Sequence, residues 1–384
     1  MYIERAANHL IDRGLAANKV LVLHGARRVG KTALLKKMIT SKQLDQDHLW
    51  LNGDDLQVHR LLEDRTVGNY QRLIGTSKLL IIDEAQKIPD IGIKLKLMVD
   101  EIAGLKILVT GSSVFDLANK LGEPLVGRKK TIRLHPLAQM EFSKTENYMQ
   151  TVERLEERMI YGGYPELVQI KELRDKQAYL NELVSDYLLK DILEFDGIRK
   201  SEKLYDLLRL LAFQVGKEVS LDELVNQLKS ISRNTVDQYL DLLSKVFVIY
   251  KVRGYSNNLR KEVTKNNRWY FYDNGIRNAI IQNFNPLSLR NDVGELWENY
   301  LAAERVKYMD YSLGQRNFYY WRTYDRQEID WVEEENGRLA AHEFKWNTRK
   351  RVKMPGAWGK AYPDDSFEVI SQDNYLDWIT PIVT

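Results

Sequence analysis

The chain has 384 residues, no cysteine and a formal net charge of +3, with 44% hydrophobic and 29% charged residues. This length corresponds to two or three domains of ordinary size. The absence of cysteine excludes disulfides and thiolate metal sites, and the small net charge does not by itself indicate nucleic-acid binding. The N-terminus lacks the apolar core of a signal peptide, and no apolar run reaches membrane-spanning length, which predicts a cytoplasmic protein that does not enter a membrane.

The first 135 residues alternate short apolar runs with amphipathic segments, which is the pattern of a parallel sheet covered by helices. We therefore predict an α/β domain over residues 1–135. Its strands are expected at Val20–His24, His48–Leu51, Leu79–Asp83, Lys106–Thr110 and Thr131–Leu134.

A phosphate-binding motif follows the first of these strands. The sequence GARRVGKT matches GxxxxGK[ST] and leads into a predicted helix at Thr32–Ile39. In such a loop backbone N–H groups face the phosphates, Lys31 neutralises phosphate charge and the Thr32 hydroxyl binds Mg²⁺. A chance glycine turn is the alternative, but the strand-loop-helix context argues against it. The motif predicts ATP and Mg²⁺ as ligands of Gly25, Ala26, Arg27, Arg28, Val29, Gly30, Lys31, Thr32 and Ala33.

Two further strands end in polar residues at the same predicted sheet edge. The run LLIIDEAQ delivers two adjacent acids, and we expect Asp83 to bind Mg²⁺ while Glu84 polarises the attacking water. The run LKILVTGSS ends in Thr110 and Ser112, which we expect to face the γ-phosphate; a simple turn is the alternative. Arg128, just before the fifth strand, is a candidate for stabilising transition-state charge, in cis or from a neighbouring subunit, or is a solvated loop residue. Self-association is therefore a possibility that the sequence leaves open.

Residues 136–290 are predicted to form a helical lid and a winged helix. Ser220 begins a capping box, Ser232 caps the next helix, and strands at Val246–Val252 and Trp269–Tyr272 would form the wing. The wing is rich in cations, which makes it a candidate DNA-binding surface. Asp237 and Asp241 in the presumed recognition helix argue against base reading, so a structural or partner-binding module is the alternative. The candidate phosphate contacts are Lys251, Arg253, Arg260, Lys261, Lys265 and Arg268.

Residues 291–384 are predicted to form a mixed α/β unit. A helix is expected at Val293–Tyr308, followed by strands at Phe318–Trp321, Glu328–Val332, Leu339–Trp346 and Phe367–Ile370. Four residues reproduce the order of a PD-(D/E)xK nuclease core, in which carboxylates bind Mg²⁺ and a lysine lies beside the scissile phosphate. A surface Glu-x-Lys pattern in an inactive fold is the alternative. The four residues are Glu298, Asp330, Glu343 and Lys345.

These motifs together resemble a known family. GARRVGKT, LLIIDEAQ, LVTGSS, the GR before IRLHPLAQMEF, YGGYPE and DYLLKDIL are similar to the prokaryotic AAA+ ATPases that carry a C-terminal domain of unknown function. The resemblance covers almost the whole chain. It implies a nucleotide-operated machine in which nucleotide state is coupled to a winged helix, and a last domain with a restriction-endonuclease-like fold. Two functions remain open: an ATPase that acts on DNA, and a regulatory switch whose C-terminal domains bind protein.

Overall fold

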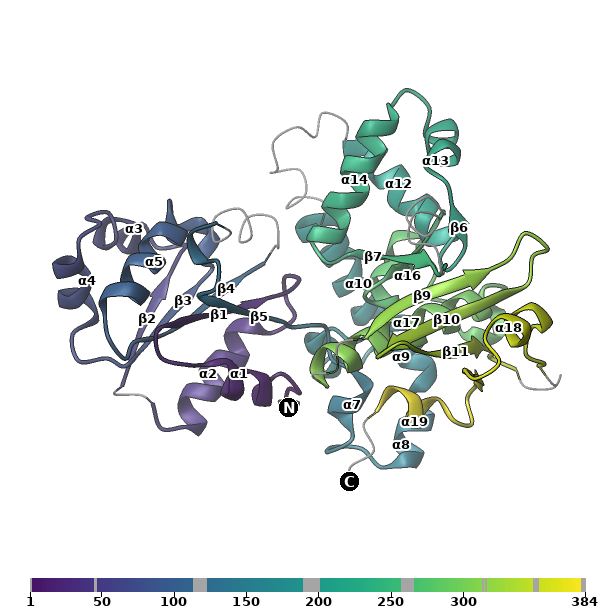
Figure 1. Cartoon of the computed structure of the whole chain (residues 1–384), viewed down its shortest axis with the longest axis horizontal. Helices are drawn as coiled ribbons and strands as arrows, with labels where there is room; N and C mark the ends of the chain where they lie inside the picture. The colour runs from purple at the N-terminus through teal and green to yellow at the C-terminus, as the bar shows by residue number, and fades with distance from the viewer. Residues whose placement is uncertain are drawn as a thin grey trace. The chain divides into compact units, whose positions relative to one another are not determined.

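The computed structural model describes residues 2–44, 47–112, 123–188, 201–256, 266–312, 314, 316–347 and 352–380 (Figure 1). The chain forms two compact units. We call Tyr2–Pro136 with Lys245–Phe247 the N-terminal unit, and Leu137–Ser244 with Val248–Thr384 the C-terminal unit. In the described part of the chain, no helix combines the length and apolar character that crossing a membrane requires.

The N-terminal unit is built on a parallel sheet of five strands in the order β2-β3-β4-β1-β5. The strands are β1 (Lys19–His24), β2 (His48–Asn52), β3 (Leu79–Asp83), β4 (Lys106–Gly111) and β5 (Lys129–Arg133). The α-helices are α1 (Asn8–Gly14), α2 (Lys31–Ser41), α3 (Leu56–Leu61), α4 (Val67–Ile74) and α5 (Ile91–Glu101), with 3₁₀ turns η1 (Ala85–Lys87) and η2 (Glu123–Leu125). Each predicted strand is present with ends shifted by at most two residues, which confirms the predicted α/β class.

The core of this unit lies on both faces of the sheet. Alternate residues of β1, β3 and β4 belong to one apolar cluster that also contains Tyr70 of α4 and Leu95 of α5. The residues between them, such as Leu21 and Ile81, are also buried. Burial on both faces explains why these strands are continuous apolar runs rather than alternating ones. The cluster residues of β1, β3 and β4 are Val20, Val22, Leu80, Ile82, Ile107 and Val109, and β2 adds Leu51.

The C-terminal unit combines helices with short strands. Its first part contains α7 (Gln139–Phe142), α8 (Tyr148–Glu153), α9 (Leu155–Tyr161), η3 (Pro165–Val168), α10 (Leu173–Glu182), η4 (Leu183–Leu188) and α12 (Ser201–Phe213). Next come β6 (Glu218–Val219), α13 (Leu221–Leu228), α14 (Arg233–Lys245), β7 (Ile249–Gly254), β8 (Asn267–Phe271), α16 (Asn274–Ile280) and η5 (Leu287–Leu289). The last part contains α17 (Val293–Tyr311), β9 (Asn317–Arg322), β10 (Glu328–Glu335), β11 (Arg338–Phe344), α18 (Gly356–Ala361), β12 (Ser366–Ile370) and α19 (Tyr375–Ile379).

The two caps predicted between α12 and β7 are present. Ser220 accepts a hydrogen bond from Glu223 N at 3.1 Å and starts α13, and Ser232 accepts one from Thr235 N at 3.1 Å before α14. Strand β7 begins at Ile249, three residues later than predicted. It pairs antiparallel with β8, which pairs in turn with β6.

One sheet runs through the whole C-terminal unit. Its seven strands have the order β12-β11-β10-β9-β7-β8-β6, so the β7–β8 hairpin continues into the strands that follow α17 (Figure 1). The connection is a parallel pairing of β7 with β9, in which Arg253 lies opposite Tyr319 and Gly254 opposite Tyr320. The predicted division into residues 136–290 and 291–384 remains a prediction, and any such domains share this sheet.

Candidate nucleotide site

The phosphate-binding loop connects β1 to α2, as its sequence predicts. Gly30 has φ +94° and precedes the first residue of α2, a left-handed conformation that glycine adopts without strain. Gly25 passes so close to β5 that a Cβ atom there would lie 2.1 Å from Leu134 O. Both glycines of the motif are thus required by the backbone path, and the loop amides come at the N-terminus of α2, where anions are stabilised.

Lys31 is buried at the start of α2. Its amine donates hydrogen bonds to Gly25 O at 2.8 Å and Ala26 O at 2.9 Å, so it bridges the loop from inside. Because phosphate oxygens are stronger acceptors than carbonyl oxygens, this amine can exchange these two bonds for bonds to a phosphate.

Two residues of the predicted site donate hydrogen bonds to the carboxylate of Asp83 at the end of β3. Thr32 Oγ1 donates to Asp83 Oδ2 at 2.8 Å, and Thr110 Oγ1 donates to Asp83 Oδ1 at 2.5 Å. Thr110 has no exposed surface and also accepts a hydrogen bond from Glu84 N at 3.0 Å. The ends of β3 and β4 and the start of α2 are therefore connected by side chains that sequence reasoning had selected.

Glu84 is held by a residue that sequence reasoning missed. Gln86 Nε2 donates to Glu84 Oε2 at 2.5 Å and to Ser112 Oγ at 3.2 Å. Glu84 has φ +51°, which directs the chain sharply into η1 and brings Gln86 back beside it. The available signal was the position of Gln86 two residues after Glu84 in LLIIDEAQ. This amide fixes the carboxylate of Glu84 without adding charge.

Arg128 lies at the N-terminal ends of the strands, whereas the P-loop follows the C-terminal end of β1. It precedes β5, its carbonyl oxygen accepts from Val20 N at 2.9 Å, and its Nε lies 2.7 Å from Asp100 Oδ1. Because β5 runs parallel to β1 and Arg133 lies opposite His24, the strand rise separates Arg128 from the P-loop end of the sheet by about 16 Å. This distance favours the version of its predicted role in which Arg128 acts on a neighbouring subunit's nucleotide, and both versions stay predictions.

The four residues of the predicted nuclease site lie near one another, and two of them contact an arginine. Arg268 of β8 lies 3.5 Å from Glu298 Oε1 and 3.4 Å from Asp330 Oδ1, and its other terminal nitrogen lies 3.0 Å from Glu328 Oε2. Lys345 pairs with Glu343 at 2.7 Å. Burial, with Asp330 adding repulsion, raises the pKa of Glu298 to about 8 and that of Glu343 to about 7.

These contacts bear on two predictions. In the described ranges no three His, Cys, Asp or Glu side chains are placed to hold a metal ion, and Arg268 and Lys345 both lie among these carboxylates, so the nuclease site stays a prediction. Arg268 itself is only 3% exposed, so it does not lie on a phosphate-binding surface. Of the other wing cations, Lys251 and Arg253 are exposed on β7, whereas Arg260, Lys261 and Lys265 lie outside the described residues.

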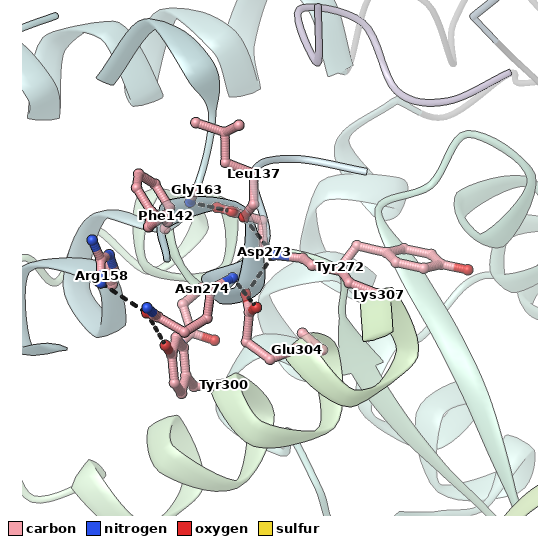
Figure 2. Close-up of a pocket in the computed structure, with 13 residues that line it drawn as sticks. Leu137, Phe142, Arg158, Gly163, Tyr272, Asp273, Asn274, Tyr300, Glu304 and Lys307 are labelled. Carbon is pink, nitrogen blue, oxygen red and sulfur yellow. Dashed lines mark hydrogen bonds and ion pairs between the residues drawn. The ribbon is translucent and has the colours of Figure 1, made fainter. Parts of the chain in front are cut away.

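The YGGYPE motif has a structural explanation. Figure 2 shows Asp273, the residue that caps α16, beside Gly163 in a small polar pocket of the C-terminal unit. Asp273 accepts from Gly163 N at 2.7 Å, and a Cβ on Gly162 would lie 2.0 Å from Asp273 Oδ1. Gly163 O accepts from Leu137 N at 2.7 Å. The two glycines thus allow the start of this unit to pack against the N-terminus of α16.

A phosphate-binding loop that opens α2, an acidic pair at the end of β3 and a buried threonine at the end of β4 are the features of a P-loop domain of the AAA type. Residues 17–143 match the family model described as an AAA domain. Residues 152–287 and 293–371 match two models described as domains of unknown function, DUF8612 and DUF4143. The match to the AAA domain model thus covers most of the N-terminal unit.

Relatives with curated sequences match most of the chain. An uncharacterized protein of Methanocaldococcus jannaschii is 25% identical over 403 residues, covering 96% of this chain and 88% of the relative. One from Mycobacterium tuberculosis is 26% identical over 353 residues, covering 90% of this chain and 74% of the relative.

Among solved structures, AMPPCP-bound DnaA from Aquifex aeolicus aligns with a TM-score of 0.33 and 16% identity, covering 63% of this chain and 89% of that one. Drosophila ORC bound to DNA aligns with a TM-score of 0.26 and 12% identity, covering 73% of this chain and 95% of that one. Scores this low support no inference about this chain.

Proposed function

We propose that the N-terminal unit binds and hydrolyses Mg-ATP. In this proposal Lys31 neutralises the charge of the β- and γ-phosphates, and Thr32 and Asp83 hold Mg²⁺. Glu84 orients the attacking water and accepts its proton, while Thr110 and Ser112 contact the γ-phosphate side of the site. Bound Mg²⁺ supplies further neutralisation of phosphate charge.

The hydrogen bond between Thr32 and Asp83 is the observation that carries this proposal. It brings a hydroxyl oxygen and a carboxylate oxygen to within 2.8 Å although the two residues are 51 positions apart. These are hard oxygen donors, the ligands that Mg²⁺ prefers. They meet at the N-terminus of α2, where the loop amides favour phosphate. A purely structural hydrogen bond would not need to be placed beside Lys31 and a second carboxylate.

Two substitutions test the assignment. Lys31→Ala should abolish binding of a fluorescent ATP analogue, since the phosphates lose their main point cation. Glu84→Gln should bind the analogue as the native chain does but release phosphate at least about a hundredfold more slowly, which is the usual lower limit for losing a general base. Lys36→Ala, an exposed cation on the same helix, is the control and should behave as native. Equal turnover by Glu84→Gln and the native chain would reject the catalytic assignment.

Arg128 enters the proposal as a group supplied by a neighbouring subunit. Its position at the far edge of the sheet, ion-paired on a partly exposed surface, favours this version. Mixing an Arg128→Ala chain with a Lys31→Ala chain should restore partial turnover, because the first keeps an intact P-loop and the second supplies the arginine. If no mixture differs from the two separate chains, Arg128 has no such role.

A second candidate function is ATP-dependent action on DNA through the region from α12 to β8. We interpret its order, with a short strand after the first helix, two further helices and a hairpin, as a winged helix. The exposed cations Lys251 and Arg253 favour DNA contact, whereas exposed Asp237 and Asp241 on α14 oppose it. A gel shift at several salt concentrations, with native chain and a Lys251→Ala, Arg253→Ala double variant, decides: equal shifts would favour a protein-binding switch.

A further inference from the structure

A cleft of about 510 Å³ lies in the N-terminal unit, and the proposed nucleotide chemistry does not use it. One wall comes from α3 and the residues after it, and the other from the segment between β3 and α5. Its lining residues are His59, Arg60, Glu63, Arg65, Pro89, Asp90 and Lys94.

The cleft contains cations that no described residue neutralises by direct contact. Arg60 and Arg65 are exposed, and their side chains make neither hydrogen bonds nor ion pairs with the described part of the chain. Lys94 is only 7% exposed, yet its amine likewise has no hydrogen-bond acceptor or ion-pair partner among described residues. Burial lowers the pKa of Lys94, with Asp90 and Glu63 opposing that effect from a distance. The side chain is thus mostly buried while its amine has no described acceptor, and a carboxylate from a ligand would supply one.

The composition of the cleft favours a peptide over a nucleic acid. Glu63 and Asp90 face the same space and would repel a continuous phosphate backbone, and no aromatic side chain lines the cleft to stack with a base. Three large apolar residues next to it in sequence are exposed: Leu56 by 67%, Leu61 by 49% and Ile93 by 43%. Cations in the cleft and exposed apolar residues on the same helices complement a segment that carries both carboxylates and apolar residues.

Both walls of the cleft are connected to the backbone of Glu84, the proposed catalytic base. Gly53, just before α3, donates its N–H to Asp83 O at 2.8 Å, and a Cβ there would lie 2.2 Å from Glu84 O. His59 in the cleft wall donates from Nε2 to Gly53 O at 2.7 Å. Asp90 in the other wall follows Glu84 through the single turn η1. A ligand that draws these walls together would therefore change the position of Glu84.

We propose that this cleft binds an acidic, partly apolar segment of a partner protein, and that its occupancy regulates ATP hydrolysis through the Gly53–Glu84 contact. The regulatory part rests on the proposed ATPase function, whereas the binding part does not. Arg60 and Arg65 capture the carboxylates at the mouth, and Lys94 pairs with the most deeply inserted one.

The test uses the full chain and a fluorescein-labelled peptide of alternating glutamate and leucine. Fluorescence anisotropy should show saturable binding that weakens about tenfold or more in an Arg60→Ala, Arg65→Ala double variant, as expected for losing two ion pairs. Lys94→Met should weaken it as well. Lys96→Ala removes an exposed cation of α5 outside the cleft and should bind as native. The peptide should also change the phosphate-release rate of the native chain at least twofold, but not that of the double variant.

Every result bears on the proposal. Equal peptide affinity in the native chain and the double variant would overturn it. It would also be overturned if the native chain bound an oligothymidylate more tightly than the peptide and the double variant lost that binding, since the cleft would then bind nucleic acid. Cleft-dependent binding without any effect on turnover would overturn the regulatory part. If the native chain hydrolyses no ATP but binding still depends on Arg60 and Arg65, the ATPase proposal fails and the peptide site stands.

Discussion

Thr110 offers the sharpest test of how the nucleotide site is organised. Its hydroxyl donates to Asp83 and accepts from the Glu84 amide, and the residue is fully buried. Thr110→Val keeps the branched shape and removes both hydrogen bonds. Because a hydrogen bond to a charged group contributes about 1.5–3 kcal/mol and one between neutral groups about 1 kcal/mol, the N-terminal unit should lose about 2–4 kcal/mol of stability.

The same substitution should slow turnover more than it weakens nucleotide binding. The P-loop and Lys31 are untouched, so affinity for an ATP analogue should change by no more than a few fold. Glu84 loses the contact that fixes its backbone, and the rate of phosphate release should fall about 10- to 100-fold, within the range that a misplaced general base allows.

Hydrogen exchange measured by mass spectrometry over β3 and β4 reports the local stability, and phosphate release reports turnover. Thr110→Ser is the matched control, since it keeps the hydroxyl and deletes only a methyl group. Turnover should be fastest in the native chain, slower in Thr110→Ser and slowest in Thr110→Val. If Thr110→Val matches Thr110→Ser in both hydrogen exchange and turnover, the hydroxyl does not organise the site and the reasoning is refuted.

Two further predictions concern the C-terminal unit. Burial raises the folded-state pKa of Glu298 to about 8 and that of Glu343 to about 7, above the ordinary value of 4.5. Their contribution to stability is therefore complete below about pH 4.5 and is lost as the pH rises through 7 to 8. Denaturant unfolding should show lower stability at pH 9 than at pH 6, with a smaller difference between the two in Glu298→Gln; the same difference in the variant and the native chain would contradict this account. Gly162→Ala should lower the thermal unfolding midpoint, because the new Cβ would collide with Asp273 and the residue has a positive φ. The control is Gly294→Ala on α17, whose Cβ would meet nothing within 4 Å and which should leave the midpoint equal or higher. Similar midpoints for the two variants would refute the steric account.

The nucleotide site could be predicted from sequence to the extent that its residues lie at strand ends. Lys31 and Thr32 belong to one contiguous motif, and Asp83 and Thr110 each end an apolar run whose neighbours in a parallel sheet finish at the same edge. The structure brings Thr32, Asp83 and Thr110 into hydrogen-bond contact. The contact of Gln86 with the Glu84 carboxylate was not predicted, because it depends on the left-handed backbone at Glu84, which the residue pattern does not indicate.

Long-range contacts decide where Arg268 lies. It was counted with the wing cations because it follows them in sequence, but strand alternation turns it towards carboxylates 30 and 62 residues further along. For Arg128, strand direction alone predicts the position, because a residue that precedes a parallel strand lies at the end of the sheet opposite the P-loop.

The β7–β9 pairing joins the β7–β8 hairpin to the rest of the C-terminal sheet. Strand β7 pairs with β8 on one side and with β9 on the other, so neither strand of the hairpin has a free edge towards the rest of the C-terminal sheet. Tyr320 strengthens the junction, since its hydroxyl donates to Asn266 O at 2.6 Å and the Arg268 guanidinium lies 4.7 Å from its ring centre. Moving the hairpin separately would break the hydrogen bonds between β7 and β9 and separate the Arg268 guanidinium from the carboxylates that neutralise it. We therefore expect the region interpreted as a winged helix and the sheet that follows it to move as one body.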